Sequence, residues 1–157
     1  MSRVWLGVAM GLGAAMGAQA EAPQQVEANR VVEIALVSEK TYANPFQLRA
    51  EPHRIYLFYR NRDYNPTWSA SDDNGKTWSE GLNHIYYQKG ERPYVKYASD
   101  GLEAIHFAFT DGHPDRPFLN SLYHAYYRRG GLYRSDGTFL HKLAEGPVKT
   151  AEATRIY

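Results

Sequence analysis

The stretch that decides the fold reads Ser71-Asp72-Asp73-Asn74-Gly75-Lys76-Thr77-Trp78. It fits the pattern S-x-D-x-G-x-T-W at every fixed position, and each fixed residue suits a tight turn between two strands. Ser71 and Asp73 carry short side chains that can bond backbone N–H groups within the turn, and Gly75 permits a positive φ. Thr77 is expected to restart a strand, and the ring of Trp78 to fold back under the turn as a small local core. The stretch predicts an architecture and contributes no chemistry.

This octapeptide resembles the Asp-box, the turn of the BNR repeat in sialidase-like β-propellers. The alternative interpretation is an ordinary hairpin with Asp-Asn-Gly at its tip. Under both interpretations the fixed residues have a structural role, and only the first predicts a propeller.

The first twenty residues have the form of a secretory signal peptide. Arg3 supplies a positive start, residues 4–17 are apolar, and Ala18-Gln19-Ala20 is a small-x-small cleavage site. An uncleaved membrane anchor is the alternative, but the apolar run is shorter than the roughly 20 residues that a membrane span needs. We therefore expect cleavage near Glu21, a secreted or periplasmic protein, and no membrane contact after cleavage.

Composition excludes several classes of protein. The chain has no cysteine, so disulfide scaffolds and thiolate metal sites are excluded. Removing Arg3 with the leader leaves 17 basic and 17 acidic residues, so no basic field is available for nucleic acid. Thirteen tyrosines and three tryptophans suit both β-strands and the apolar faces of sugars, and strand packing accounts for most of them.

The chain after the leader reads as strands and turns. The two strongest strands, 54–60 and 104–110, are about fifty residues apart, the size of a four-stranded propeller blade. In the second of them, Ile105, Phe107 and Phe109 alternate onto one face. The sequence therefore predicts an all-β fold, a partial β-propeller of about two to three blades, with a small antiparallel sandwich as the competing interpretation.

The expected organisation has three parts. Residues 1–20 are the signal peptide, 21–42 a lead-in with a first strand, and 43–157 the partial propeller, with blades near 43–87 and 92–140. Residues 152–157 are expected to begin a new strand. Because a propeller closes with roughly four to eight blades, we expect a fragment or a truncated reading frame, with assembly from several short chains as the alternative.

Propeller topology sorts the loops into two faces. The Asp-box joins the third and fourth strands of a blade and defines one face. The loops 61–66 and 111–120 then emerge together on the opposite face, and 89–92 joins them. Both long loops are rich in polar and charged residues, as binding loops on a rigid scaffold are.

Four further segments resemble the BNR repeat-containing family of secreted propellers: Arg92-Pro93-Tyr94-Val95-Lys96-Tyr97, Ile105 to Pro114, Asn120 to Tyr127, and Tyr133-Arg134-Ser135-Asp136-Gly137. The likeness covers about residues 43–157. The family is similar to seven-bladed propeller lyases that cleave polysaccharides next to uronic acids, including ulvan and rhamnose–glucuronate lyases. The resemblance implies a polysaccharide or oligosaccharide partner, in the first place an acidic one, and does not by itself imply catalysis.

Elimination next to a uronate requires neutralising the carboxylate, abstracting the proton at carbon five and protonating the leaving oxygen. Arginine suits the first task, and histidine or tyrosine suits the others. The predicted catalytic residues are His113, Arg116 and Tyr64. The predicted substrate-binding residues are Arg62, Asp63, Asn65, Arg92, Asp111 and Arg128, the last lying at the far end of its strand.

The chain departs from the lyases at one point. Their pattern has a pair of histidines at places that here hold Asn44-Pro45 and Asp63-Tyr64-Asn65. A non-catalytic carbohydrate-binding propeller, and an inactive truncated fragment, therefore remain as alternatives to an enzyme. No metal or other cofactor is predicted. Calcium is left open as an alternative, although it has no motif, and His106, His113 and His124 lack the spacing of a zinc site.

Overall fold

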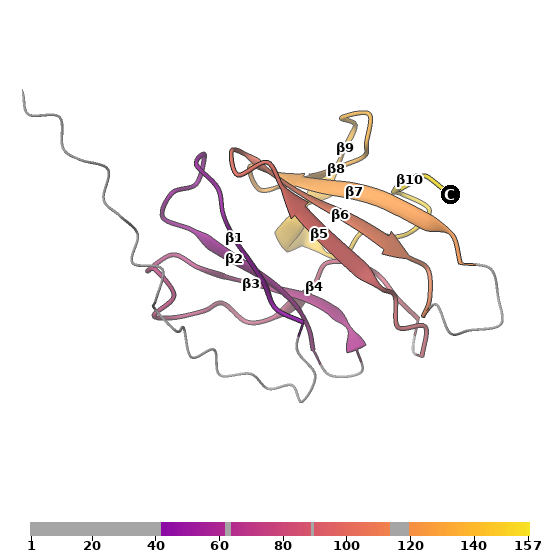
Figure 1. Ribbon diagram of the computed structural model, residues 1–157, viewed down its shortest axis with the longest axis horizontal. Helices are drawn as coiled ribbons and strands as arrows, with labels where there is room; N and C mark the ends of the chain where they lie inside the picture. Colours follow the sequence, from indigo (N-terminus) through magenta and orange to yellow (C-terminus); the bar gives the residue numbers. More distant parts are fainter. Residues whose placement is uncertain (1–41, 62–63, 89, 114–119) are drawn as a thin grey trace, which may run out of the picture. The chain divides into compact units, whose positions relative to one another are not determined.

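The computed structural model describes residues 42–61, 64–88, 90–113 and 120–157, all within one compact unit, Val32–Tyr157. These residues form two antiparallel sheets (Figure 1). The first sheet has the order β1 (Asn44–Gln47), β2 (Ile55–Arg60), β3 (Pro66–Ser71) and β4 (Leu82–Asn83). The second has the order β5 (Val95–Ser99), β6 (Ala104–Thr110), β7 (Leu122–Arg128), β8 (Gly131–Tyr133) and β9 (Phe139–Lys142), and β10 (Thr154–Arg155) pairs with β7.

The described residues contain the 3-10 helical turn η2 (Leu143–Glu145) and no α-helix. The all-β class predicted from the sequence is therefore confirmed. No helix in the described part of the chain is long and apolar enough to span a membrane. The predicted signal peptide and all of the lead-in except Tyr42 lie outside the described residues.

Alternation of side chains explains how the second sheet forms. Ile105, Phe107 and Phe109 of β6 are fully buried on one face, as predicted. They lie beside Ala125 and Tyr127 of β7, which alternate onto the same face. The residues between them point to the opposite face and are only half-buried.

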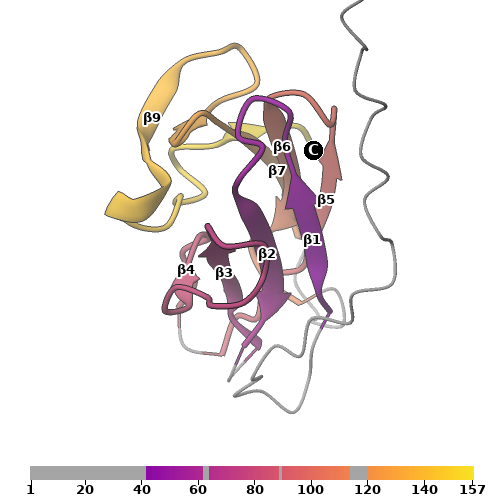
Figure 2. The ribbon, with the colours of Figure 1, turned by 90° about the vertical axis from the view of Figure 1, so that its left-hand side faces the viewer.

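The two sheets share one hydrophobic core. Phe58 of β2 lies with its ring 6.0 Å from Phe107 and 5.1 Å from Tyr97 of the second sheet. Figure 2 shows β1–β3 lying against β5–β7. The core cluster comprises Leu48, Tyr56, Phe58, Trp68, Ala70, Ile85, Ile105, Phe107, Phe109, Ala125, Tyr127, Leu132, Leu143, Val148 and Ala153.

A three-residue polar cluster also joins the sheets. The hydroxyl of Tyr127 donates to both carboxylate oxygens of Glu51 at 2.9 Å, and the hydroxyl of Tyr56 donates to Oε1 at 2.9 Å. The two hydroxyl groups also contact each other. Burial raises the pKa of Tyr56 to about 12, and it raises the pKa of Tyr127 as well, so both hydroxyls keep their hydrogens.

The Asp-box turn is held by its own side chains. Ser71 Oγ donates to Asp73 Oδ1 at 2.8 Å and accepts the N–H of Gly75 at 2.7 Å. Asp73 also accepts the N–H and the hydroxyl of Thr77, at 2.8 and 2.7 Å. Gly75 has a φ of 83°, and its carbonyl accepts the indole N–H of Trp78 at 3.2 Å. The hydrogen bonds to Asp73 lower the pKa of its carboxyl group to about 2.

The prediction that Thr77 restarts a strand was wrong. Both donors of Thr77 are bound to Asp73, so its N–H cannot join the sheet. Two residues on, Ser79 Oγ takes the place of a backbone carbonyl as acceptor for the N–H of Ala70. Regular pairing resumes only at β4, where Leu82 and Asn83 face Trp68 and Thr67.

The end of the chain also differs from the prediction. Residues 152–157 were expected to begin a strand outside the second blade, but β10 pairs with Tyr123 and His124 of the second sheet. This is sterically open because β8 covers only Tyr126 to Arg128 on that edge of β7. The short strand β9, which pairs with β8, was not predicted.

Candidate functional site

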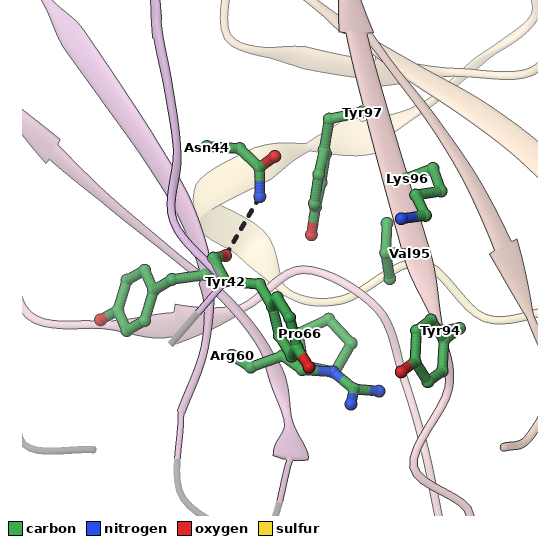
Figure 3. A pocket seen from close by; sticks show the side chains of 9 residues that line it. Tyr42, Asn44, Arg60, Pro66, Tyr94, Val95, Lys96 and Tyr97 are labelled. Atoms are coloured by element: carbon green, nitrogen blue, oxygen red, sulfur yellow. Dashed lines mark hydrogen bonds between the residues drawn. The ribbon is translucent and has the colours of Figure 1, made fainter. Parts of the chain in front are cut away.

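A cavity of about 230 Å³ lies where strand ends of the two sheets meet, at the end of β2 and β3 opposite the Asp-box. Strand β2 ends at Arg60, its partner β3 begins at Pro66, and β5 begins at Val95. The lining residues are Tyr42, Asn44, Tyr59, Arg60, Pro66, Tyr94, Val95, Lys96 and Tyr97 (Figure 3). This lining contains two cations, four tyrosines and no acidic residue.

Arg60 connects the two sheets at the cavity. Its side chain is 8% exposed, and Nη2 donates to the carbonyl of Pro93 at 2.8 Å. The guanidinium carbon lies 4.4 Å from the centroid of the Tyr94 ring and 5.5 Å from that of Tyr64. The guanidinium carbon of Arg92 lies 5.0 Å from the centroid of the Tyr64 ring. Such cation–π contacts contribute roughly 0.5–2 kcal/mol each and hold the rings in place.

His113 belongs to the same cluster. Its ring lies 5.1 Å from the ring of Tyr94, edge to face. The backbone is fixed on both sides, because the N–H of His113 donates to the Glu91 carbonyl at 2.9 Å and its carbonyl accepts from Asn120 at 3.1 Å. Loops that are distant in the sequence therefore meet around Tyr94.

The structure thus brings together three of the residues predicted from the sequence: Tyr64, Arg92 and His113. The residues that connect them, Arg60 and Tyr94, were not predicted as site residues. Tyr94 lies within one of the segments that carried the family resemblance, but its packing against Arg60 depends on the pairing of the two sheets.

One lining residue, Tyr97, contacts a buried histidine. The hydroxyl of Tyr97 lies 2.9 Å from Nε2 of His84. His84 is fully buried, and burial lowers its pKa to about 3, so the imidazole is neutral at physiological pH. Burial raises the pKa of Tyr97, which keeps its hydroxyl hydrogen.

Other predicted residues lie apart from the cavity lining. The carboxylate of Asp111 accepts the N–H of Ser121 at 3.4 Å, and the buried Oδ1 of Asn65 has no hydrogen-bond partner in the described part of the chain. Arg128 is at the opposite end of β7, where it lies 3.9 Å from Glu103 and 5.1 Å from the ring of Tyr133. Arg62, Asp63 and Arg116 lie outside the described residues.

Asn44, which the family resemblance matched to a histidine of the lyases, lines the cavity. Its Nδ2 donates to the carbonyl of Tyr42 at 3.1 Å (Figure 3). It also donates to the carbonyl of Phe58 at 3.4 Å. Residues 42–61, 64–88, 90–113 and 120–157 contain no group of three or more His, Cys, Asp or Glu side chains that could hold a metal ion.

Residues 15–157 match the model of the BNR repeat-containing family. The chain belongs to this family. A search of the curated proteins gave no match.

Two solved structures resemble this BNR chain. One is a PL25 ulvan lyase bound to -[GlcA(1-4)Rha3S]-, with a TM-score of 0.56 and 15% identity. The other is a PL25 ulvan lyase, with a TM-score of 0.56 and 16% identity. In both cases the match covers 74% of this chain and 30% of the lyase, so the BNR chain spans less than a third of those proteins.

These matches decide between the two folds considered above. The sheets of the BNR chain are part of a propeller, and the sandwich interpretation is set aside. At this level of identity the solved structures establish the fold, and the chemistry of this chain rests on its own residues.

Proposed function

We propose that this protein is a carbohydrate-active propeller that binds a uronate-containing polysaccharide at the cavity and cleaves it by β-elimination. The observation that carries the proposal is the lining: Arg60 and Lys96 supply positive charge, tyrosine rings supply apolar surface, and none of the nine lining residues is acidic. Guanidinium and ammonium groups pair with carboxylates, and aromatic rings pack on the apolar faces of sugars.

The solved relative supports this ligand class. A PL25 ulvan lyase of similar fold was determined with an oligosaccharide that contains GlcA, a uronic acid. The acidic sugar and the cationic cavity are complementary in charge, which favours both orientation and rate of encounter. Consistent with a polysaccharide substrate, we propose that the protein is secreted or periplasmic.

The proposed reaction breaks the bond between carbon four and the leaving oxygen. A base removes the proton at carbon five, the electron pair forms the double bond between carbons four and five, and the leaving oxygen takes a proton. Cations beside the uronate carboxylate make carbon five more acidic. Arg60, Arg92 and Lys96 are suited to that role, and His113, in contact with Tyr94, is suited to the proton transfers.

Binding without cleavage is the second candidate. The observation that favours it is that Asn44, the residue that the family resemblance matched to a lyase histidine, lines the cavity with its amide. An amide can hold a sugar oxygen, but it does not titrate near neutral pH and so cannot serve as a general acid or base.

The test uses the full chain with an oligosaccharide of the repeat GlcA(1-4)Rha3S. Calorimetry measures binding, and ultraviolet absorbance measures the unsaturated product. We expect Lys96→Ala to weaken binding by about threefold to tenfold, and His113→Ala to reduce the rate of product formation by about 10²- to 10⁴-fold with little change in affinity. The matched control is Lys76→Ala, since Lys76 is in the Asp-box at the other end of the sheet.

Three results are informative. If wild-type chain binds no acidic oligosaccharide, the proposed function is wrong. If it binds the oligosaccharide and forms no unsaturated product, the second candidate is correct. If His113→Ala forms product as fast as wild type, His113 has no part in the reaction.

A further inference from the structure

The pair formed by Tyr97 and His84 has a feature that the proposed reaction does not use. Tyr97 reaches from β5 into the cavity, and its hydroxyl oxygen faces the space between Asn44 and Val95 (Figure 3). The same oxygen lies 2.9 Å from His84 Nε2. One side of the hydroxyl therefore meets a buried imidazole and the other meets the ligand space.

The imidazole of His84 is held in one place. Its ring packs edge to face against Phe58 at 5.0 Å and Phe107 at 5.6 Å. Its backbone N–H donates to the carbonyl of Pro66 at 3.1 Å, and its carbonyl accepts from Val148 at 2.9 Å. The side chain is fully buried, so it cannot reorient without opening the core between the sheets.

The surroundings of Nδ1, the other ring nitrogen of His84, indicate which group donates in the hydrogen bond between His84 and Tyr97. Nδ1 of His84 is buried and has no hydrogen-bond partner within the described ranges. If Tyr97 donated to Nε2, the neutral ring would carry its hydrogen on Nδ1, and a buried N–H would be left without an acceptor. If His84 donates from Nε2, Nδ1 is only an unused acceptor. Buried donors without a partner are rarer and costlier than under-used acceptors, so the second arrangement is favoured.

We infer that His84 is a positioning residue that donates from Nε2 to the hydroxyl oxygen of Tyr97 and so directs the hydroxyl hydrogen of Tyr97 into the cavity. There the hydrogen is donated to a carboxylate oxygen of the bound uronate. The inference rests on the proposed function for the identity of the ligand. It adds to the cavity a neutral donor with a fixed direction, next to the two cations Arg60 and Lys96.

The direction of this donor selects among ligands. Charge alone would bind any anion that fits, since Arg60 and Lys96 do not distinguish a carboxylate from a sulfate. A hydroxyl fixed by a buried ring requires an acceptor oxygen at one place, so a ligand that lacks that oxygen leaves the donor unpaired. Tyr97 is therefore expected to favour an acidic sugar whose carboxylate places an oxygen at that point over anions of another shape.

The first experiment needs no ligand. Nitrogen-15 NMR of the imidazole side chains of the full chain distinguishes a protonated Nε2 from a protonated Nδ1. We expect His84 to be protonated on Nε2 alone at pH 7. Protonation on Nδ1 would overturn the assignment of the hydrogen and with it the inference.

The second experiment measures affinity for the oligosaccharide of GlcA(1-4)Rha3S. Tyr97→Phe keeps the ring and removes only the hydroxyl, and Tyr126→Phe, on the opposite face of the second sheet, is the control. Loss of one hydrogen bond to a charged group is expected to weaken binding about tenfold to a hundredfold in Tyr97→Phe and to leave Tyr126→Phe unchanged. His84→Phe is expected to weaken binding in the same direction, and His84→Gln, which retains a side-chain N–H, to restore part of it.

The outcomes separate the inference from the function on which it rests. If wild type binds the oligosaccharide and Tyr97→Phe binds it equally well, the inference is wrong and the proposed function stands. If wild type does not bind the oligosaccharide, the proposed function is wrong, and the inferred ligand of Tyr97 is wrong with it. Equal weakening by His84→Gln and His84→Phe, with both variants folded, would contradict the donor role of His84.

Discussion

Replacing Tyr127 by phenylalanine tests whether the polar cluster between the sheets stabilises their packing. The substitution keeps the ring, which is 1% exposed, and removes a hydroxyl that contacts both oxygens of Glu51 and the hydroxyl of Tyr56. One of the lost hydrogen-bond partners is the carboxylate of Glu51, and a hydrogen bond to a charged group contributes roughly 1.5–3 kcal/mol. We expect Tyr127→Phe to lower the free energy of unfolding by about 2 kcal/mol.

The contacts of the cluster predict an order among variants. Tyr56 contacts one carboxylate oxygen of Glu51, whereas Tyr127 contacts both, so Tyr56→Phe should be the milder change. In Tyr127→Phe, Glu51 still accepts from Tyr56. In Tyr56→Phe, it still accepts from Tyr127. The double variant should therefore lose more than the two single variants together, because only then is the carboxylate left without a hydroxyl donor from either sheet.

The assay is urea unfolding of the full chain, followed by circular dichroism and by tryptophan fluorescence. Coincidence of the two signals checks that unfolding is two-state. Tyr86→Phe is the control, since Tyr86 is 48% exposed and its loss of a hydroxyl should change stability by less than about 0.5 kcal/mol. The reasoning is refuted if Tyr127→Phe is no less stable than Tyr86→Phe, or if the two buried hydroxyls prove strictly additive.

Two further predictions concern pH. The hydrogen bonds to Asp73 lower the pKa of its carboxyl group to about 2, below the ordinary value near 3.8. The ionised carboxylate therefore stabilises the fold fully above pH 3.8, and this stabilisation is lost as the pH falls toward 2. Unfolding measured over this acid range should show the loss in wild type and not in Asp73→Asn. Burial lowers the pKa of His84 to about 3, so between pH 6.5 and 3 the unfolded chain binds a proton that the folded chain excludes. The free energy of unfolding should therefore fall as the pH falls from about 6.5 toward 3. If His84→Gln shows the same dependence of stability on pH as wild type, His84 is not the group responsible.

The candidate site illustrates how far sequence reasoning extends. Tyr64, Arg92 and His113 were predicted because propeller topology places their loops on one face, and the structure brings all three around Tyr94. Arg60 was missed because it is the last residue of a strand and resembles any charged residue at the end of a sheet. Its role depends on the carbonyl of Pro93, 33 residues away, which only the second sheet brings into reach.

The prediction at Thr77 failed for a related reason. A β-branched residue before a tryptophan favours a strand, and that propensity was read correctly. The competing contact, both donors of Thr77 on the carboxylate of Asp73, is stronger than the propensity and removes the N–H that a strand would use.

The sequence by itself determined the features whose contacts are local. The Asp-box turn closes through hydrogen bonds that span at most four residues, and the alternation in β6 needs only its own period of two. The tertiary structure alone decided the cavity, the pairing of Tyr97 with His84 and the cluster of Glu51, Tyr56 and Tyr127, in which contacting residues are up to 76 positions apart. Such contacts form only when the two sheets pack face to face and bury their apolar side chains from water. Which faces pack together cannot be predicted from one stretch of sequence.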